Sequence, residues 1–248
     1  MAPLKTGQNE FIENVKSFAT VVAIFLLIRI FLFQPFTIPS ASMEPLLRNG
    51  DYIVVTKFDY GFSRHSIPFS PPLFEGRLFG REPRRGDVIV FRVPTANNVD
   101  YIKRLIGLPG DEVQVKEGKL YLNDVLVPDV DLGPARSQGA MALSVRRIRE
   151  TLPEGRAFDI FDAGYTMGDN TDVFVVPAGH YFFMGDNRDN SLDSRFTTDS
   201  GGVGLVPAER LIGRARIIVM SWRPGASLFK PWTWFTHAEP SRFLKSLG

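Results

Sequence analysis

The 248-residue sequence contains no cysteine and only three histidines. The absence of cysteine excludes disulfide bonds, thiolate nucleophiles and cysteine-based metal sites, although it does not locate the compartment. None of the histidines, His65, His180 and His237, has an acidic residue in an obvious orienting position. A serine–histidine–aspartate triad is therefore unattractive, and a serine hydrolase with this sequence would need another base.

A strong net charge is also absent, because 29 Lys and Arg nearly balance 27 Asp and Glu and leave +2. The sequence has no basic footprint for nucleic acid, and we expect no nucleic-acid partner. Helical periodicity is almost absent after residue 36. Short β-branched and aromatic runs, separated by Gly- and Pro-containing turns, instead indicate an all-β globular part.

The expected strands are short and spread along the chain. They are 51–58, 88–93, 100–107, 113–115, 120–122, 173–176, 180–184 and 211–222. Residues 60–85 are rich in Pro, Gly and Arg and are expected to form an extended loop. Residues 123–172 are expected to be polar and irregular, with a basic patch at Arg146, Arg147 and Arg149.

A long apolar run lies near the amino terminus. From Ser17 to Phe33 the sole charged residue is Arg29, and this length is close to the lower limit of about 17–25 residues for a membrane-spanning helix. Gln34-Pro35 should end the helix, so the sequence predicts a single transmembrane anchor over 15–36. The alternative is a signal peptide cleaved within 40–42, which acidic residues before the run and prolines after it disfavour.

Two serines follow the anchor, in the segment Phe36-Thr37-Ile38-Pro39-Ser40-Ala41-Ser42-Met43-Glu44-Pro45. Prolines at both ends restrict the backbone, so the two hydroxyls should be held at defined angles. A rigidly held hydroxyl beside a membrane anchor suggests a nucleophile that acts in or near the bilayer. Such a hydroxyl is a poor nucleophile until a base takes its proton.

A lysine in the predicted strand 100–107 is the alternative to a histidine base. Lys103 and Arg104 must point to opposite faces of this strand, so one of the two is expected to face the interior. Burial lowers the pKa of a lysine and can leave a neutral amine that acts as a general base. The strand alone leaves open whether Lys103 is that base or a solvated residue beside a buried Arg104.

A polar loop over 184–195 contains three Asp, two Asn, two Ser and two Arg. Its acidic and amide residues could bind calcium, but the glycine and terminal glutamate of an EF-hand loop are missing. We therefore expect no metal ion and no cofactor. The loop is dense in hydrogen-bonding groups and follows a predicted strand.

Three segments together resemble the signature boxes of bacterial type I signal peptidases. The segments are 40–45, 101–111 and 185–195, in this order after an anchor. The resemblance extends to about Trp222 and implies a membrane-bound serine endopeptidase that removes signal peptides from exported preproteins. It implies cleavage after small residues, at sites of the Ala-x-Ala type, without a cofactor.

The resemblance also implies roles for single residues. Ser42 corresponds to the nucleophile, Lys103 to the general base, Ser40 to an oxyanion-hole donor and Ser191 to the residue that orients the lysine amine. The positions that support the site are matched by Gly185, Asp193 and Arg195. Five apolar or aromatic residues match pocket-lining positions, with ordinary core packing as the alternative: Phe36, Ile38, Met43, Leu47 and Tyr101.

The implied fold is mainly β, with one amino-terminal transmembrane helix, a β-barrel-like catalytic core and an inserted smaller β subdomain. The expected boundaries are 1–14 for a cytoplasmic amino terminus, 15–36 for the anchor, 37–111 and 173–222 for the core, 112–172 for the insertion and 223–248 for an aromatic-rich tail. The resemblance places the catalytic domain on the extracytoplasmic side of the bacterial plasma membrane. Within the tail, the strip 228–235 is expected to rest on the bilayer, with packing on the barrel as the alternative.

Two rival functions fit parts of the sequence. A self-cleaving repressor would share the Ser-Lys dyad and a related β-fold, but it needs a DNA-binding module where this chain has an apolar run. A membrane-tethered domain that binds peptides without cutting them would have no need of Lys103 on a buried face. The residue at 103 therefore distinguishes the enzyme from the binding module.

Overall fold

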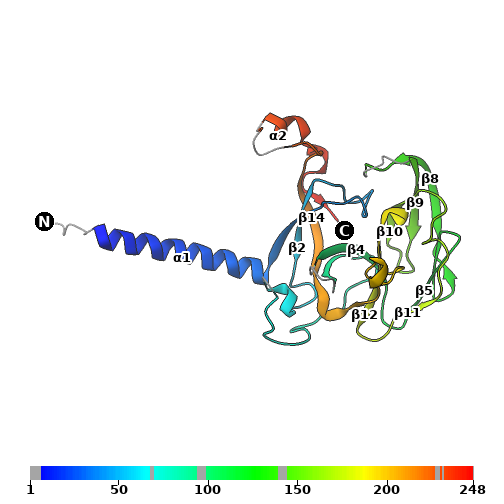
Figure 1. Cartoon of the computed structure of the whole chain (residues 1–248), viewed down its shortest axis with the longest axis horizontal. Helices are drawn as coiled ribbons and strands as arrows, with labels where there is room; N and C mark the ends of the chain where they lie inside the picture. Colours follow the sequence, from blue (N-terminus) through cyan, green and yellow to red (C-terminus); the bar gives the residue numbers. More distant parts are fainter. Residues whose placement is uncertain are drawn as a thin grey trace.

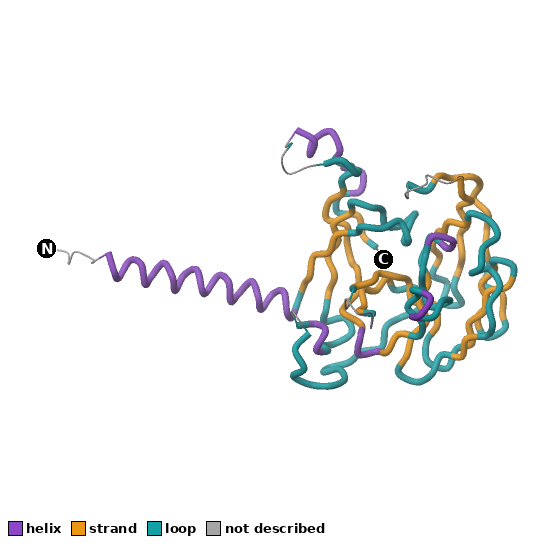
Figure 2. Tube along the Cα trace, viewed as in Figure 1, coloured by secondary structure: helices purple, strands orange, loops and turns teal. Residues whose placement is uncertain are grey.

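The computed structural model describes residues 7–67, 70–93, 99–138, 144–226, 230 and 232–247. A long amino-terminal helix extends from a β-rich body (Figure 1). Strands dominate the body, and the helical segments within it are short (Figure 2). The predicted fold class, mainly β after one amino-terminal apolar helix, is confirmed.

Helix α1 covers Gly7–Phe31. Its part Glu10–Phe31 is long and apolar enough to cross a membrane, and none of it is buried against the body. Strand β1 (Phe33–Thr37) follows directly and pairs with β2 (Asp51–Thr56). The helix therefore begins before residue 15 of the predicted anchor. It ends before residue 36, because the residues around Pro35 are held in a sheet.

The largest sheet has eight strands, and all three motifs lie in its strands or in the loops that join them. Its order is β1-β2-β14-β3-β4-β12-β13, with β15 paired to β14. The remaining strands are β3 (Val88–Arg92), β4 (Asp100–Gly107), β12 (His180–Met184), β13 (Val206–Pro207), β14 (Leu211–Ser221) and β15 (Lys245–Ser246). The predicted strands 100–107 and 180–184 match β4 and β12, since both are buried runs that a sheet interior favours.

Two smaller antiparallel sheets are built mainly from the chain between β4 and β12. One has the order β11-β5-β6-β7 and the other β10-β9-β8. Their strands are β5 (Glu112–Lys116), β6 (Lys119–Leu122), β7 (Val125–Leu126), β8 (Asp129–Arg136), β9 (Ser144–Thr151), β10 (Ala157–Asp162) and β11 (Phe174–Val175). Since β11 pairs with β5, this part of the fold extends past residue 172.

The expectation that 123–172 is irregular is wrong, because β8, β9 and β10 form a sheet within it. The basic patch lies on β9. There Arg147 and Arg149 both pair with Asp159 of β10, while Arg146 pairs with Asp131 of β8. Opposite charges on neighbouring strands are cross-strand partners that a single-strand pattern does not reveal.

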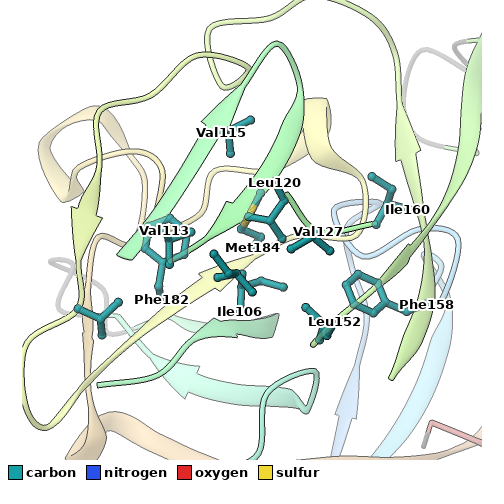
Figure 3. Packing of buried hydrophobic residues seen from close by; sticks show 12 residues of the cluster. Ile106, Val113, Val115, Leu120, Val127, Leu152, Phe158, Ile160, Phe182 and Met184 are labelled. Atoms are coloured by element: carbon teal, nitrogen blue, oxygen red, sulfur yellow. The ribbon is translucent and has the colours of Figure 1, made fainter. Parts of the chain in front are cut away.

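A shared apolar core joins the smaller sheets to the large one (Figure 3). Ile106 and Phe182 of the large sheet pack in the same cluster as Val113, Leu120 and Ile160 of the smaller sheets. The side of β4 and β12 that faces this cluster is therefore covered by the smaller sheets. On the opposite side of these strands, Leu105 and Phe183 pack in another apolar cluster, while Lys103 lies in the wall of a cleft.

Candidate active site

The serine motif, strand β4 and the polar loop meet at one cleft of about 740 Å³. The serine motif lies between β1 and β2, and the polar loop follows β12. Strands β4 and β12 are hydrogen-bonded neighbours, so the loop after β12 returns beside the middle of β4. The three predicted boxes are thus brought together, with Ser40, Ser42, Lys103 and Ser191 in the wall of the cleft.

The Lys103 amine and the Ser42 hydroxyl are in direct contact. Lys103 Nζ donates to Ser42 Oγ over 2.5 Å. The lysine is 3% exposed, and burial lowers its pKa to about 8, although the nearby carboxylates of Asp193 and Asp186 act in the opposite direction. A lysine with this pKa is partly neutral near pH 8 and can then accept the serine proton.

The second serine of the motif lies next to the first. Ser40 Oγ is 3.3 Å from Ser42 Oγ, and Ser40 is exposed at the mouth of the cleft. A hydroxyl at this place can donate to an oxygen that forms on a carbonyl attacked by Ser42.

Gly185 allows close packing of the polar loop, between Ser191 of the loop itself and the backbone of Ser42. A Cβ added at Gly185 would overlap the Ser191 hydroxyl and come within 2.6 Å of the Ser42 carbonyl oxygen. Ser191 Oγ is buried and has no hydrogen-bond partner among the described residues. Unpaired buried hydroxyls are rare and cluster at functional sites, so this oxygen is in place to act on a group inside the cleft.

A buried ion pair supports this loop from behind. Arg195 Nε donates to Asp193 Oδ1 over 2.9 Å, and Arg195 Nη2 donates to Asp193 Oδ2 over 3.0 Å. The Gly185 N–H donates to the same carboxylate over 2.9 Å. Burial opposes ionisation of Asp193, but the Arg195 guanidinium and this N–H hold its pKa below the ordinary value. The loop therefore keeps a negative charge near the Lys103 amine.

Lys103 and Arg104 are both buried, although the strand pattern required only one of the two to face the interior. Arg104 points to the opposite face of β4, where the smaller sheets cover it. Its guanidinium pairs with Asp186 at 2.7 and 2.6 Å and lies 4.1 Å from the centre of the Phe158 ring. The sheet of β8, β9 and β10 that shields this face was not predicted from the sequence.

The five residues matched to pocket positions are divided between the cleft and the core. Tyr101 lines the cleft. Ile38, Met43 and Leu47 are buried in the apolar cluster of the large sheet, and Phe36 is half-buried against it. Contact of these four with substrate stays a prediction.

Sequence reasoning missed one wall of the cleft, which Thr166 and Met167 form together with Leu192 and Phe196. The polar loop holds part of this wall in place, since Asp189 accepts from the Ala163 N–H over 2.6 Å and from Thr166 Oγ1 over 2.8 Å. The segment around Met167 has no β pattern and no charge cluster, so the sequence offers no signal for it.

The arrangement suits nucleophilic acyl transfer. A hydroxyl touches a buried amine, a second hydroxyl lies beside it, and the surrounding cleft is mostly apolar. Within the described part of the chain, no group of three His, Cys, Asp or Glu side chains could hold a metal ion.

The match to a protein family and the matches to individual sequences agree with one another. Residues 11–222 match the protein family described as signal peptidase, peptidase S26. The chain is 45% identical over 226 residues to the signal peptidase I of Rickettsia felis, covering 88% of this chain and 81% of the relative. It is also 45% identical over 214 residues to the signal peptidase I of Rickettsia akari, covering 83% and 78% of the two chains. A crystal structure of a signal peptidase I from Enterococcus faecalis aligns with 54% of this chain and 97% of that chain, at 28% identity and a TM-score of 0.32. The chain belongs to the signal peptidase family, peptidase S26.

Proposed function

We propose that Ser42 and Lys103 carry out the removal of signal peptides by this serine endopeptidase. The observation that carries the assignment is the 2.5 Å contact between Lys103 Nζ and Ser42 Oγ in a buried setting. Burying a lysine amine is unfavourable, and such groups cluster at catalytic sites, where a lowered pKa is needed. A peptide-binding domain without catalytic activity would have no use for this contact.

The first half of the reaction forms an acyl-enzyme. The neutral Lys103 amine takes the Ser42 proton as the serine oxygen attacks the scissile carbonyl. Negative charge develops on the carbonyl oxygen, which accepts hydrogen bonds from the Ser42 N–H and the Ser40 hydroxyl. The Lys103 ammonium then gives its proton to the departing amine of the mature protein, and the signal peptide remains esterified to Ser42.

The second half regenerates the enzyme. Lys103, again neutral, takes a proton from a water molecule that attacks the ester, and the proton returns to Ser42 as the signal peptide leaves with a carboxyl group. Ser191 orients the lysine amine in both halves, and its buried, unpaired hydroxyl in the cleft wall supports this role. Asp193 and Arg195 hold the loop that carries Ser191.

Substrates of the Ala-x-Ala type fit the site best. An extended peptide can lie along the cleft beside Tyr101 of β4 and be read as an added strand. Small side chains at the first and third positions before the scissile bond are proposed to contact Ile38 and Met43, which flank the two serines in the sequence and pack in the apolar cluster of the large sheet. The near balance of acidic and basic residues gives no reason to expect a nucleic-acid partner.

The body is assigned to the extracytoplasmic side of the bacterial plasma membrane, with α1 as the single anchor. A short connection supports this assignment, because β1 follows α1 directly and leads into the serine motif. Ser42 would then act close to the bilayer surface, where the cleavage site of a signal peptide emerges. Residues 112–172 are assigned to an inserted subdomain, to which β11 adds a strand.

The aromatic tail is proposed to contact the same leaflet. Leu228, Phe229 and Pro231 of the predicted strip lie outside the described residues. Within the described part, helix α2 (Trp232–His237) exposes Trp232 and Phe235. Tryptophan favours the interface between lipid and water.

Cleavage of a preprotein with an Ala-x-Ala site by the full chain tests the assignment. Ser42→Ala and Lys103→Ala should each abolish cleavage, because one removes the nucleophile and the other the base. Activity that survives in Ser42→Ala would reject the mechanism. A thermal unfolding transition like that of the wild type would show that each variant is folded.

A further inference from the structure

The carbonyl groups on both sides of Ser42 are held by one buried residue of the polar loop. Asn187 is 2% exposed. Its side-chain Nδ2 donates to the Ala41 carbonyl oxygen over 3.1 Å, and its backbone N–H donates to the Ser42 carbonyl oxygen over 3.1 Å. The reaction described above gives Asn187 no role.

The contact with Ala41 sets the direction of the Ser42 N–H. The Ala41–Ser42 peptide is trans, and in a trans peptide the C=O and the N–H lie in one plane and point in opposite directions. Since the Ala41 carbonyl points to Asn187, the Ser42 N–H points away from it. This N–H donates to no acceptor among the residues that the structure describes, so it is free to bind a substrate oxygen.

Ser137, which follows strand β8, determines which way the Asn187 amide faces. Asn187 Nδ2 lies 3.3 Å from Ser137 Oγ as well as near the Ala41 carbonyl. The Ser137 hydroxyl gives its own proton to Glu44 Oε2 over 2.5 Å, so it presents lone pairs to Asn187. With the amide reversed, its oxygen would face two acceptors, which disfavours that orientation.

Glu44 connects the contacts of Asn187 and Ser137 to the serine motif, of which it is a part. It lies two residues after Ser42, is 1% exposed, and also accepts from the Gln138 N–H over 3.0 Å. A buried carboxylate requires such donors. The chain of contacts therefore runs from Glu44 through Ser137 and Asn187 to Ala41, and so to the peptide plane of Ser42.

We propose that Asn187, oriented by Ser137 and Glu44, is a positioning residue that aims the Ser42 N–H at the oxyanion. The proposal rests on the proposed function, in which this N–H binds the tetrahedral intermediate. It gives the three-stranded sheet a part in the reaction, because Ser137 immediately follows β8.

The test measures kcat and KM for preprotein cleavage by the full chain in detergent. Asn187→Ala should lower kcat about 10- to 100-fold and change KM less than about twofold. A Ser42 N–H that points in the wrong direction stabilises the negative charge of the transition state less well, but it affects substrate binding little. Asn187→Asp should lower kcat further, since a carboxylate brings acceptors to the Ala41 carbonyl. In Asn187→Ala the pKa seen in the pH profile should stay at the wild-type value, because no charge near Lys103 is changed.

A second variant tests the relay without removing Asn187. Ser137→Ala should lower kcat by a smaller factor, and the double variant Ser137→Ala/Asn187→Ala should be no worse than Asn187→Ala, since both act through one contact. Asn123→Ala is the matched control, because the Asn123 side chain also makes two hydrogen bonds, with the Glu112 N–H and with Asp111, but lies away from the cleft. Its kcat should equal that of the wild type.

Wild-type kcat in folded Asn187→Ala, or a raised KM with unchanged kcat, would overturn the proposal. Additive losses in the double variant would do the same for the relay through Ser137. Ser42→Ala distinguishes a failure of the positioning role of Asn187 from a failure of the nucleophile assignment. If Ser42→Ala is inactive and Asn187→Ala is fully active, the positioning role is wrong and the nucleophile assignment stands, whereas an active Ser42→Ala rejects both.

Discussion

At the scale of single residues, the reaction depends on how little water reaches the Lys103 amine. A lysine in water has a pKa well above neutrality, and its amine is then protonated and unable to accept a proton. Burial removes the hydration that stabilises the charged form. Asp193 and Asp186 restore part of that stabilisation, so the pKa reflects a balance between burial and two carboxylates.

The rate of cleavage should therefore depend on pH in one direction. Below the Lys103 pKa of about 8 the base is protonated, so kcat/KM should fall about tenfold for each further pH unit and level off above that pKa. Asp193→Asn should move the midpoint to lower pH, because it removes a charge that favours the protonated amine. A flat profile between pH 6 and about 10 would exclude Lys103 as the base.

Gly185 is the residue at which a single methyl group should be decisive. Gly185→Ala would press a Cβ against the Ser191 hydroxyl and the Ser42 carbonyl, so we expect kcat to fall on the order of 100-fold, as when an oxyanion donor is displaced. Gly80→Ala is the control, since its Cβ would meet only Arg77 Cβ at 3.7 Å. Comparable kcat values in the two variants would show that the loop moves without cost.

At the scale of elements, the strands that the sequence predicts best are those that the core buries. β4 and β12 are continuous buried runs, and such runs can be recognised without knowing their neighbours. β9 carries two consecutive exposed arginines and a third one further on, and its Arg147 and Arg149 are stabilised by Asp159 of another strand. That partner is set by the fold, so the sheet was not predictable from β9 alone.

The end of α1 and the hydrogen bonds around Asn187 could not be predicted for the same reason, since both depend on residues that are distant in the sequence. The predicted anchor extends to residue 36, yet β1 begins at Phe33 and Phe36 pairs with Ile53 of β2. Asn187 could be predicted to lie in the active-site loop, but its contact with Ser137 joins residues 50 positions apart. The motifs identify the reacting residues, whereas the residues that aim them depend on distant pairings.

One buried ion pair links the three-stranded sheet to the active-site loop. Both oxygens of Glu150 on β9 accept from Arg188 over 2.5 Å, and the two side chains are 4% and 5% exposed. Glu150→Ala would leave the buried Arg188 guanidinium without its ion-pair partner. We expect the free energy of unfolding to fall by about 3–5 kcal/mol, measured by denaturant titration in detergent.

The matched control is the exposed pair between Arg146 on the same strand and Asp131. Arg146→Ala should leave the unfolding midpoint almost unchanged, because water screens this pair. If the two variants are equally stable, the Glu150–Arg188 pair does not hold the sheet to the loop.

At the scale of the whole molecule, several exposed apolar groups lie at the end of the body where α1 leaves it. Figure 1 places α2 at this end, and the loop over residues 60–85 lies there too, with Phe62 in contact with Phe31 of α1. On that loop Phe79 is 87% exposed. An anchored body would bring these groups to the lipid surface together.

Replacing Trp232 and Trp234 with Ser, in a chain that lacks residues 1–31, should therefore weaken binding to vesicles of phosphatidylethanolamine and phosphatidylglycerol. Two large rings that are partly buried in the interface account for a loss of roughly tenfold in affinity, measured by co-sedimentation. The control replaces Val125 and Val130 with Ser, since both are exposed on the smaller sheets, which Figure 1 shows on the side of the body away from α1. Equal binding by the two variants would mean that the tail does not touch lipid, and that α1 alone holds Ser42 near the bilayer.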